Sequence, residues 1–178
     1  GEEFDPAVGF NPRNGFKRVQ PTVNYRPRPK NWELVRQMEF GVDFEYMTDM
    51  RNRLLTRETK LTLFELNLES ADRLSAEVVN LKEYLDHDFE IVEGNSITVG
   101  NYVTNGFQIS GETSERRIVA AELSFSSGEF WTGKKQTVEG ELSVKPFPGL
   151  TVQTDFEHNS VVLSEGGFDT NLYRLTLG

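Results

Sequence analysis

The sequence predicts an all-β protein, an antiparallel up-and-down meander of about nine long strands. Two observations indicate this class. Apolar and polar residues alternate with a period of two along most of the 178 residues, as expected for strands, in which successive side chains point to opposite faces. Clusters of Gly, Pro, Asn and Asp separate the alternating segments and mark the turns between them.

The composition limits the classes to which the chain can belong. A net charge of −9 argues against a nucleic-acid-binding surface, which needs clustered Lys and Arg. Without cysteine the chain has neither a disulfide framework nor a thiolate metal site. No apolar run reaches the roughly 18 residues of a transmembrane helix, but membrane strands, which are apolar on one face only, escape this test. We expect one domain over residues 1–178 that opens with an irregular lead over residues 1–16.

Each predicted strand is a segment of continuous alternation. The nine segments are Arg18–Arg26, Trp32–Met47, Leu54–Leu68, Leu74–Tyr84, Asn101–Ser110, Arg117–Ser126, Gln136–Lys145, Leu150–Asn159 and Phe168–Leu177. In the third segment the apolar phase slips from odd to even positions, which predicts a β-bulge near Leu63. The fourth also has helix-compatible spacing, but the β-branched Val78 and Val79 favour a strand.

The gaps between the segments alternate in length. The shorter gaps are residues 27–31, 69–73, 111–116 and 146–149, and the longer ones are residues 48–53, 86–100, 127–135 and 160–167. Every second connection of a meander lies at the same end, so one end of the sheet should carry short turns and the other long loops. Outer-membrane barrels have this asymmetry.

The second segment has the dimensions of a membrane strand. From Leu34 to Phe44 there are ten steps, about 33 Å, which a tilt near 40° projects onto about 25 Å, the height of the lipid-facing band of such barrels. Trp32 and Tyr46 lie just beyond its ends, where amphipathic rings favour the water–lipid interface. Arg36 is the exception in the apolar phase, and its position near one end allows it to snorkel.

The alternation is equally compatible with a soluble antiparallel barrel or sandwich that acts as a binding module. In that case the apolar face would point inwards and the acidic positions would face water. Alternation alone does not distinguish these readings.

Several segments together resemble the C-terminal barrel of a family of Gram-negative outer-membrane proteins, a domain of unknown function that often follows a sandwich similar to a family-9 carbohydrate-binding module. The resembling residues are Pro6–Phe10 with Gly15, Tyr25–Pro29, Leu55–Glu58, Asp88–Ile91 ahead of Gly100 and Tyr102, Arg116–Arg117, Gly128–Phe130 with Gly133, and Gly167–Phe168 with Thr170, Leu172 and Arg174.

The resemblance implies a porin-like barrel in the bacterial outer membrane that serves carbohydrate capture or uptake, with the lipid bilayer and carbohydrate as partners. Some members carry a label of membrane-associated hydrolase. No residue of this chain supports that activity, so a membrane-associated hydrolase is a further alternative only with an active site outside this segment. The sandwich is absent, and so is the terminal aromatic residue of such barrels. We therefore expect a segment truncated at both ends, whose partners include the missing flanking strands of the same protein.

Candidate catalytic residues are few. His158-Asn159-Ser160 contains the residue types of a phospholipase triad, but on a strand His158 and Ser160 lie about 7 Å apart on one face, beyond the roughly 3 Å that catalysis needs. Asp86-His87-Asp88 does not define a metal geometry. The carboxylate pairs Glu139/Glu141 and Asp155/Glu157 have spacings that suit glycoside hydrolysis. Acidic residues on one face of a strand are, however, also expected where that face lines a water-filled lumen. We predict no catalytic residue, metal or cofactor and no nucleic-acid partner.

The sequence thus predicts two faces of a membrane barrel wall. The predicted lumen-facing residues are Glu33, Gln37, Glu39, Asp43, Glu45, Glu139, Glu141, Asp155 and Glu157. The predicted lipid-facing residues are Trp32, Leu34, Met38, Phe40, Val42, Phe44 and Tyr46.

Overall fold

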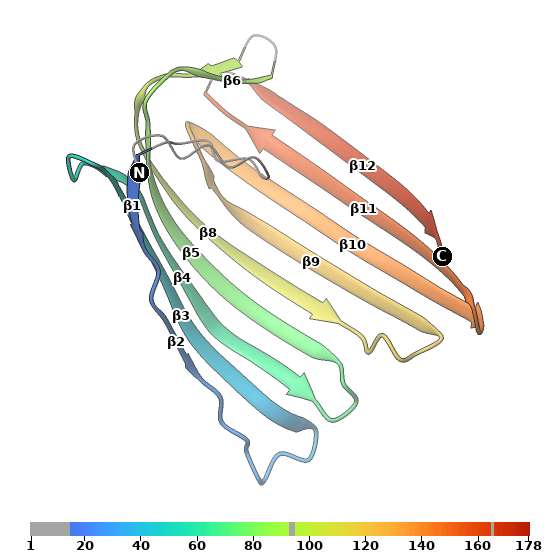
Figure 1. Cartoon of the computed structure of the whole chain (residues 1–178). Coiled ribbons are helices and arrows are strands. Elements are labelled where there is room, and N and C mark those ends of the chain that lie inside the picture. The colour runs from blue at the N-terminus through green and yellow to red at the C-terminus, as the bar shows by residue number, and fades with distance from the viewer. Residues whose placement is uncertain (1–14, 93–94, 165) are drawn as a thin grey trace.

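The computed structural model is a large antiparallel sheet with one small hairpin (Figure 1), and it describes residues 15–92, 95–164 and 166–178, without the side chains of residues 89–96. The ten strands of the sheet are β1 (Phe16–Val19), β2 (Thr22–Tyr25), β3 (Val35–Asp49), β4 (Leu54–Leu68), β5 (Arg73–Leu85), β8 (Gly100–Glu112), β9 (Val119–Phe130), β10 (Gly133–Phe147), β11 (Leu150–Val162) and β12 (Gly167–Leu177). Their order is β1-β3-β4-β5-β8-β9-β10-β11-β12, with β2 also paired to β3. Strands β6 (Phe89–Val92) and β7 (Asn95–Ile97) pair with each other.

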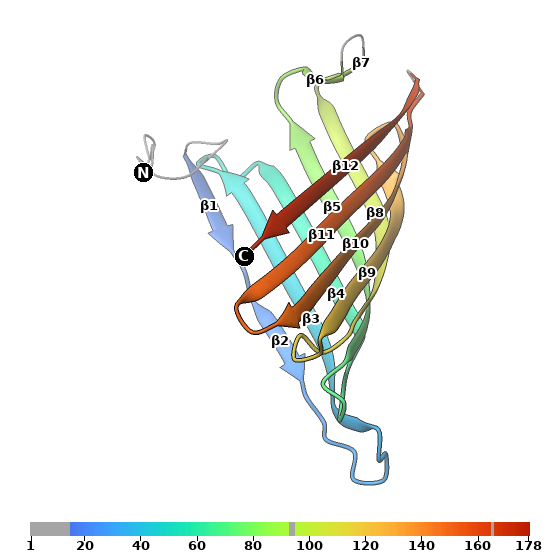
Figure 2. The same ribbon diagram turned by 90° about the vertical axis from the view of Figure 1, so that its right-hand side faces the viewer.

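The sheet is strongly curved and open. Figures 1 and 2 show it as a trough whose two walls are formed by β1 to β5 and by β9 to β12, with β8 between them. Strands β1 and β2 form one edge and β12 forms the other, and no pairing joins the two edges within the described residues. No helix in the described part of the chain is long and apolar enough to span a membrane.

The all-β meander is confirmed, and each of the nine predicted segments lies in the sheet. The first segment is divided into β1 and β2 at Gln20-Pro21, because a proline nitrogen has no hydrogen to donate to the ladder. The segment with helix-compatible spacing is strand β5. Of the predicted irregular lead, residues 1–14 lie outside the described residues.

Two bulges explain irregularities in the sequence pattern. The register of β4 against β5 shifts between Thr62 and Phe64, which confirms the bulge near Leu63. A second shift, between Val35 and Gln37, leaves Arg36 as the extra, unpaired residue of a bulge at the start of β3. The strand begins at Val35, so the prediction that it begins at Trp32 is wrong. Arg36 lies at the exposed end of β3, away from the middle of the apolar face.

The predicted difference in loop length is mostly wrong. Residues 127–135, expected as a long loop, are largely strand, and only Trp131-Thr132 connect β9 to β10. The connection expected over residues 160–167 is shortened to residues 163–166. Between β9 and β10 the apolar alternation stops before the strands do, and backbone pairing continues through polar residues on both faces. The two longest connections are residues 86–99, which contain β6 and β7, and residues 26–34 between β2 and β3, which lie at the end where short turns were expected.

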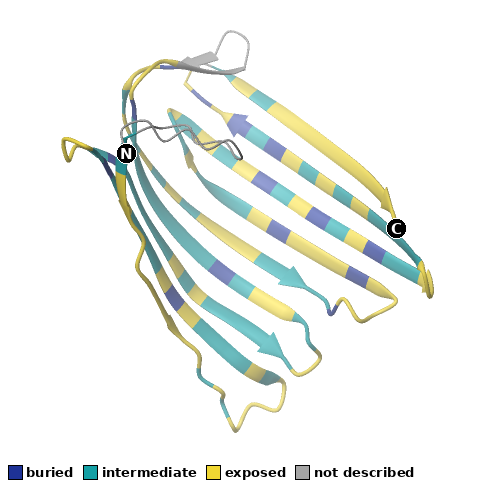
Figure 3. Cartoon of the chain, in the orientation of Figure 1, coloured by how far each residue is buried: buried dark blue, intermediate teal, exposed yellow. Residues whose placement is uncertain are grey.

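Figure 3 shows exposed and buried residues alternating along β9, β10 and β11, whereas β12 is exposed along most of its length. The buried residues of β9 to β11 are mostly small or polar and include Ser124, Thr137, Ser143 and Asn159, whereas Val161 is buried and apolar. The concave side of β9 to β11 is therefore mostly polar.

Asp72 joins two neighbouring turns. Its carboxylate accepts hydrogen bonds from Ser70 Oγ at 2.7 Å, from the Ser114 backbone nitrogen at 2.9 Å and from Arg117 Nη2 at 2.7 Å. The turn between β4 and β5 is thereby tied to the turn between β8 and β9.

Replacing Asp72 with Asn should destabilise the protein more at neutral pH than in acid. The hydrogen bond from Ser70 and that from the Ser114 N–H lower the pKa of Asp72 below its ordinary value. A depressed folded-state pKa stabilises the fold above the unfolded pKa of about 3.9, and this stabilisation is lost as the pH falls through the folded pKa. Thermal unfolding at pH 7 and pH 3 measures the difference; an equal effect of Asp72→Asn at both pH values would contradict it.

Candidate functional site

The register assigns every strand residue to one of two faces, because directly opposed residues of antiparallel strands share a face. One row crosses the sheet through Glu39, Glu65, Ser75, Ser110, Ser124, Glu139 and Glu157. The neighbouring row passes through Gln37, Asn67, Arg73, Glu112, Glu122, Glu141, Asp155 and Arg174. Both rows lie on the concave face, and we call them the acidic rows.

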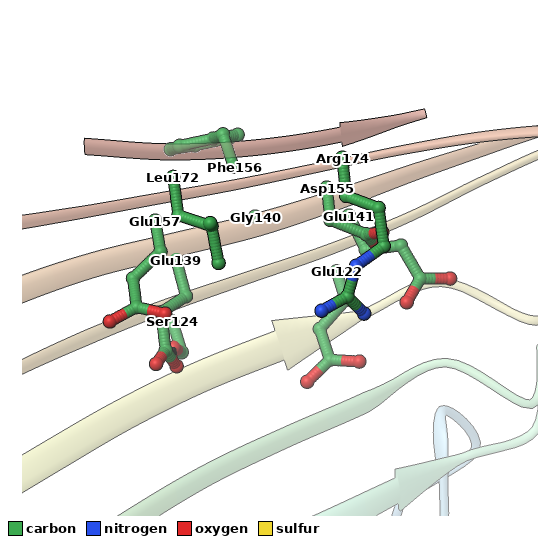
Figure 4. A pocket seen from close by; sticks show the side chains of 10 residues that line it. All are labelled: Glu122, Ser124, Glu139, Gly140, Glu141, Asp155, Phe156, Glu157, Leu172 and Arg174. Carbon is green, nitrogen blue, oxygen red and sulfur yellow. Dashed lines mark hydrogen bonds between the residues drawn. The ribbon is translucent and has the colours of Figure 1, made fainter. Parts of the chain in front are cut away.

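The acidic rows end in a hollow over β9 to β12. It has a volume of about 250 Å³. Its lining residues are Glu122, Ser124, Glu139, Gly140, Glu141, Asp155, Phe156, Glu157, Leu172 and Arg174. Figure 4 shows the carboxylates and the Arg174 guanidinium on one side of the strands and the Phe156 ring on the other. The hollow therefore gathers five carboxylates and one guanidinium on the concave face.

Polar side chains, not cations, contact these carboxylates. Ser124 Oγ donates to Glu139 at 2.9 Å, and Gln153 Nε2 donates to Asp155 Oδ1 at 3.0 Å. Asn159 Nδ2 donates to Glu157 at 2.6 Å. Within the described residues, no Lys or Arg nitrogen comes within 4.0 Å of any of the five carboxylates of the hollow, and the second oxygen of Asp155 is buried without a hydrogen-bond partner.

The acids at the other end of the concave face are paired. Arg26 Nε lies 2.7 Å from Glu39, and Arg18 Nη2 lies 2.6 Å from Glu45. Thr22 Oγ1 donates to Asp43 at 2.7 Å. These partners come from β1, β2 and the residue after β2. The acids of β3 are therefore paired by neighbouring residues, whereas those of the hollow have no cationic partner in the described part of the chain.

The predicted residues of both sets mostly share the expected faces. Gln37, Glu39, Asp43 and Glu45 lie on the same face as Glu139, Glu141, Asp155 and Glu157. Met38, Phe40, Val42, Phe44 and Tyr46 lie on the opposite face. Trp32, Glu33 and Leu34 precede β3 and lie in the turn, so they belong to neither face.

Several residues of the acidic rows were missed from the sequence. Glu65, Glu112 and Glu122 continue the rows across β4, β8 and β9. The period of two in each segment already separates these acids from the apolar positions, as in Glu122 between Ala121 and Leu123. Their alignment with the acids of β10 and β11 depends on the register between strands, which a single sequence does not reveal.

The convex face carries the large apolar side chains, although it has no protein to pack against. Leu123 is 57 % exposed, Ile109 52 % and Leu175 66 %. Further apolar residues on this face with more than a third of their surface exposed are Val19, Val23, Tyr25, Phe40, Val42, Tyr46, Leu61, Leu74, Val103, Phe107, Val119, Phe125, Leu142, Phe156, Val162, Tyr173 and Leu177.

These side chains form a band, which we call the apolar band. On β3 it runs from Val35 to Tyr46, and because a bulge takes up one residue this is about 33 Å of strand. On β10 it runs from Val138 to Val144, about 20 Å. Towards the end of the sheet near β6 the outward residues become polar. Examples are Asn80, Asn105, Ser127, Glu129, Lys134, Gln136, His158 and Asn171.

Gly140 makes room for an aromatic ring in this band. Phe156 lies directly opposite Gly140, and a Cβ atom added at residue 140 would overlap the ring. Gly140→Ala should therefore lower the free energy of unfolding by about 1 to 3 kcal/mol. In the double variant Gly140→Ala/Phe156→Ala the cost of the glycine replacement should largely disappear, which a double-mutant cycle of unfolding free energies measures. Additive effects of the two substitutions would contradict the overlap.

The structure separates the residues of the candidate triad. His158 and Ser160 lie on the convex face, and His158 Nδ1 is 2.8 Å from Asn171 Oδ1. Asn159 is buried on the concave face, where Thr137 Oγ1 donates to it at 2.8 Å. No group of three or more His, Cys, Asp or Glu residues suited to a metal ion occurs in the described part of the chain.

Comparisons of the chain with models of protein families, with curated proteins and with solved structures find no match.

Proposed function

We propose that the chain forms part of the wall of a porin-like β-barrel in the bacterial outer membrane, with the acidic rows facing a water-filled lumen and the apolar band facing lipid. One observation carries the proposal: most of the exposed large apolar side chains of the strands lie on the convex face of a curved sheet, while most of the carboxylates lie on its concave face. Membrane barrels have this arrangement, with an apolar exterior and a polar interior.

A soluble barrel or sandwich needs the opposite curvature. If the sheet closed around its concave face in water, it would enclose Glu122, Glu141 and Asp155 and leave Leu123, Ile109 and Leu175 in solvent. Buried carboxylates without cationic partners are costly, and a monomeric soluble protein rarely exposes an apolar surface of this extent. The soluble binding module is therefore the less favoured reading.

The acidic rows favour cations and uncharged polar solutes in the lumen. Five carboxylates against one guanidinium in the hollow repel anions, whereas carboxylate oxygens accept hydrogen bonds from sugar hydroxyls. This chemistry is consistent with a lumen that takes up or binds carbohydrate and needs no catalysis.

The open edges require further strands. In a bilayer, unpaired N–H and C=O groups along β12 and along β1 and β2 would cost several kcal/mol each, so a membrane barrel must be closed. We propose that flanking strands of the same protein complete it.

Single-cysteine labelling tests the proposal directly, because the chain has no native cysteine. The pair Glu122→Cys and Leu123→Cys places a nitroxide label on adjacent residues of β9 that point to opposite faces. In liposomes, the label at residue 123 should be relaxed by oxygen, which concentrates in lipid, and the label at residue 122 by a water-soluble nickel chelate.

The same pair of labelled variants also tests the alternative of a soluble barrel or sandwich. If both labels respond to the nickel chelate, or if the protein stays monomeric in buffer and does not associate with liposomes, the membrane proposal is wrong. Glu139→Cys and Val138→Cys repeat the comparison on β10, where the two residues again lie on opposite faces.

A further inference from the structure

The convex face contains a second hollow, at the border between the apolar band and the polar end of the sheet. It has a volume of about 670 Å³ and is mostly apolar. Leu61, Val78 and Phe107 from β4, β5 and β8 form its apolar part. Its polar side is formed by Asn80, Asn105, Lys134 and Glu129, whose carboxylate is held by Asn105. An amphipathic hollow at this level fits an amphipathic ligand.

The hollow exists because β8 and β9 separate. Their pairing stops at Gly106 and Gly128, beyond which the two strands diverge towards the end near β6 (Figure 1). A Cβ atom on Gly128 would lie 2.6 Å from the Gly106 Cα, so only glycine allows this close crossing. Beyond the crossing, the Glu129 carboxylate accepts from the Asn105 backbone nitrogen at 2.9 Å and from Asn105 Nδ2 at 2.7 Å.

Two cations face each other beside this hollow. Arg57 of β4 and Lys82 of β5 are directly opposed, and like charges in such positions repel each other. Their neighbours on the same face are Tyr46, Thr59, Asn80, Tyr84 and Val103, none of them acidic. No carboxylate lies within 4.0 Å of either cation in the described residues.

Arg57 also has unused hydrogen-bonding capacity. Its Nη2 donates to Asn80 Oδ1 at 3.0 Å, and Asn80 Nδ2 donates to Asn105 Oδ1 at 2.7 Å, so the guanidinium is held beside two residues that line the hollow. Its Nε atom is buried and has no hydrogen-bond partner within the described protein. The remaining guanidinium N–H groups of Arg57, beside the ammonium group of Lys82, suit a phosphate, which accepts several charge-assisted hydrogen bonds.

We propose that Arg57 and Lys82 bind the phosphate of an anionic lipid whose acyl chain lies over Leu61, Val78 and Phe107. The charge of the pair complements the headgroup, and the apolar floor of the hollow continues into the apolar band, where acyl chains would lie. The site deepens the proposed function, since it needs the convex face to meet lipid.

Titration of short-chain phosphatidic acid into the detergent-solubilised full chain, followed by native mass spectrometry, tests this site. The double variant Arg57→Gln/Lys82→Gln should bind the lipid more weakly by about tenfold for each cation removed. Lys17→Gln/Arg36→Gln removes the same charge from exposed positions outside the hollow and should bind as the wild type does. Should the double variant fail to fold, Lys82→Gln alone should still weaken binding about tenfold.

Two further probes identify the ligand class. Phosphatidylcholine of equal chain length should bind more weakly than phosphatidic acid, and inorganic phosphate should not compete at similar concentrations. Equal competition by inorganic phosphate, or equal binding by both double variants, overturns the proposal. A protein that passes the labelling test in liposomes but shows no preference for phosphatidic acid refutes the lipid site alone, whereas failure of the labelling test refutes the barrel.

Discussion

Leu123→Arg is expected to lower the free energy of unfolding in lipid by about 2 to 4 kcal/mol, the cost of an Arg near the middle of the lipid-facing side of a barrel. Leu123 lies within the apolar band on β9, flanked along the strand by Ala121 and Phe125 on the same face. Its side chain is more than half exposed, so the substitution opens no protein cavity. The expected loss comes from placing a cation in hydrocarbon, and unfolding by denaturant in liposomes measures it.

Ser127→Arg is the matched control, because Ser127 lies on the same strand and the same face as Leu123 but beyond the apolar band. Near an interface the cost of Arg falls to about 0 to 1 kcal/mol. The difference between the two variants therefore reports depth in the bilayer rather than charge or strand propensity. Equal, small effects at both positions would indicate that the convex face meets water.

The second large effect is expected on ion selectivity. The triple variant Glu122→Gln/Glu141→Gln/Asp155→Asn removes three carboxylates of the hollow and keeps their shapes and hydrogen-bonding oxygens. A unit charge at 4 Å changes the energy of an ion in water by about 1 kcal/mol, equivalent to about fivefold in occupancy. The ratio of cation to anion permeability of the reconstituted full-length protein should therefore fall several-fold, most strongly at low salt, where screening is least.

A control with the same change in net charge separates local from general electrostatics. Glu33→Gln/Glu69→Gln/Asp169→Asn also removes three negative charges, but these residues are exposed and lie in turns or on the convex side of β12. Its permeability ratio should stay close to that of the wild type. If both triple variants lower the ratio equally, the acidic rows do not line the conducting path.

The strands were predictable because the signal for them is local. Alternation placed all nine segments, and the slip of phase from Leu61 and Leu63 to Phe64 located a bulge that the register confirms. The strand ends were not predictable, since alternation between polar and apolar residues stops before backbone pairing does. Ser127, Glu129 and Lys134 remain in the ladder although neither face is apolar there, and for this reason the expected long loop is a two-residue turn.

The candidate site was only partly predictable. The acids of β3, β10 and β11 share a face as expected, but Trp32, Glu33 and Leu34 fall in a turn, closed by the hydrogen bond from the Val35 N–H to the Trp32 carbonyl at 3.1 Å, and the strand begins only at Val35. No pattern in the sequence predicts the hollow beside Arg57 and Lys82. It depends on the register of β4 against β5 and on the divergence of β8 from β9 at Gly106 and Gly128.

The sequence by itself determined that this protein has two chemically different faces, because a period of two sorts side chains to opposite sides of any extended strand. Only the tertiary structure decided which face is inside. Curvature is a property of the whole sheet, set by the twist, stagger and bulges of many paired strands, and no single strand contains it. Because the sheet bends towards Glu122, Glu141 and Asp155 and away from Leu123 and Leu175, the same alternation that would suit a soluble barrel here presents its apolar side outwards.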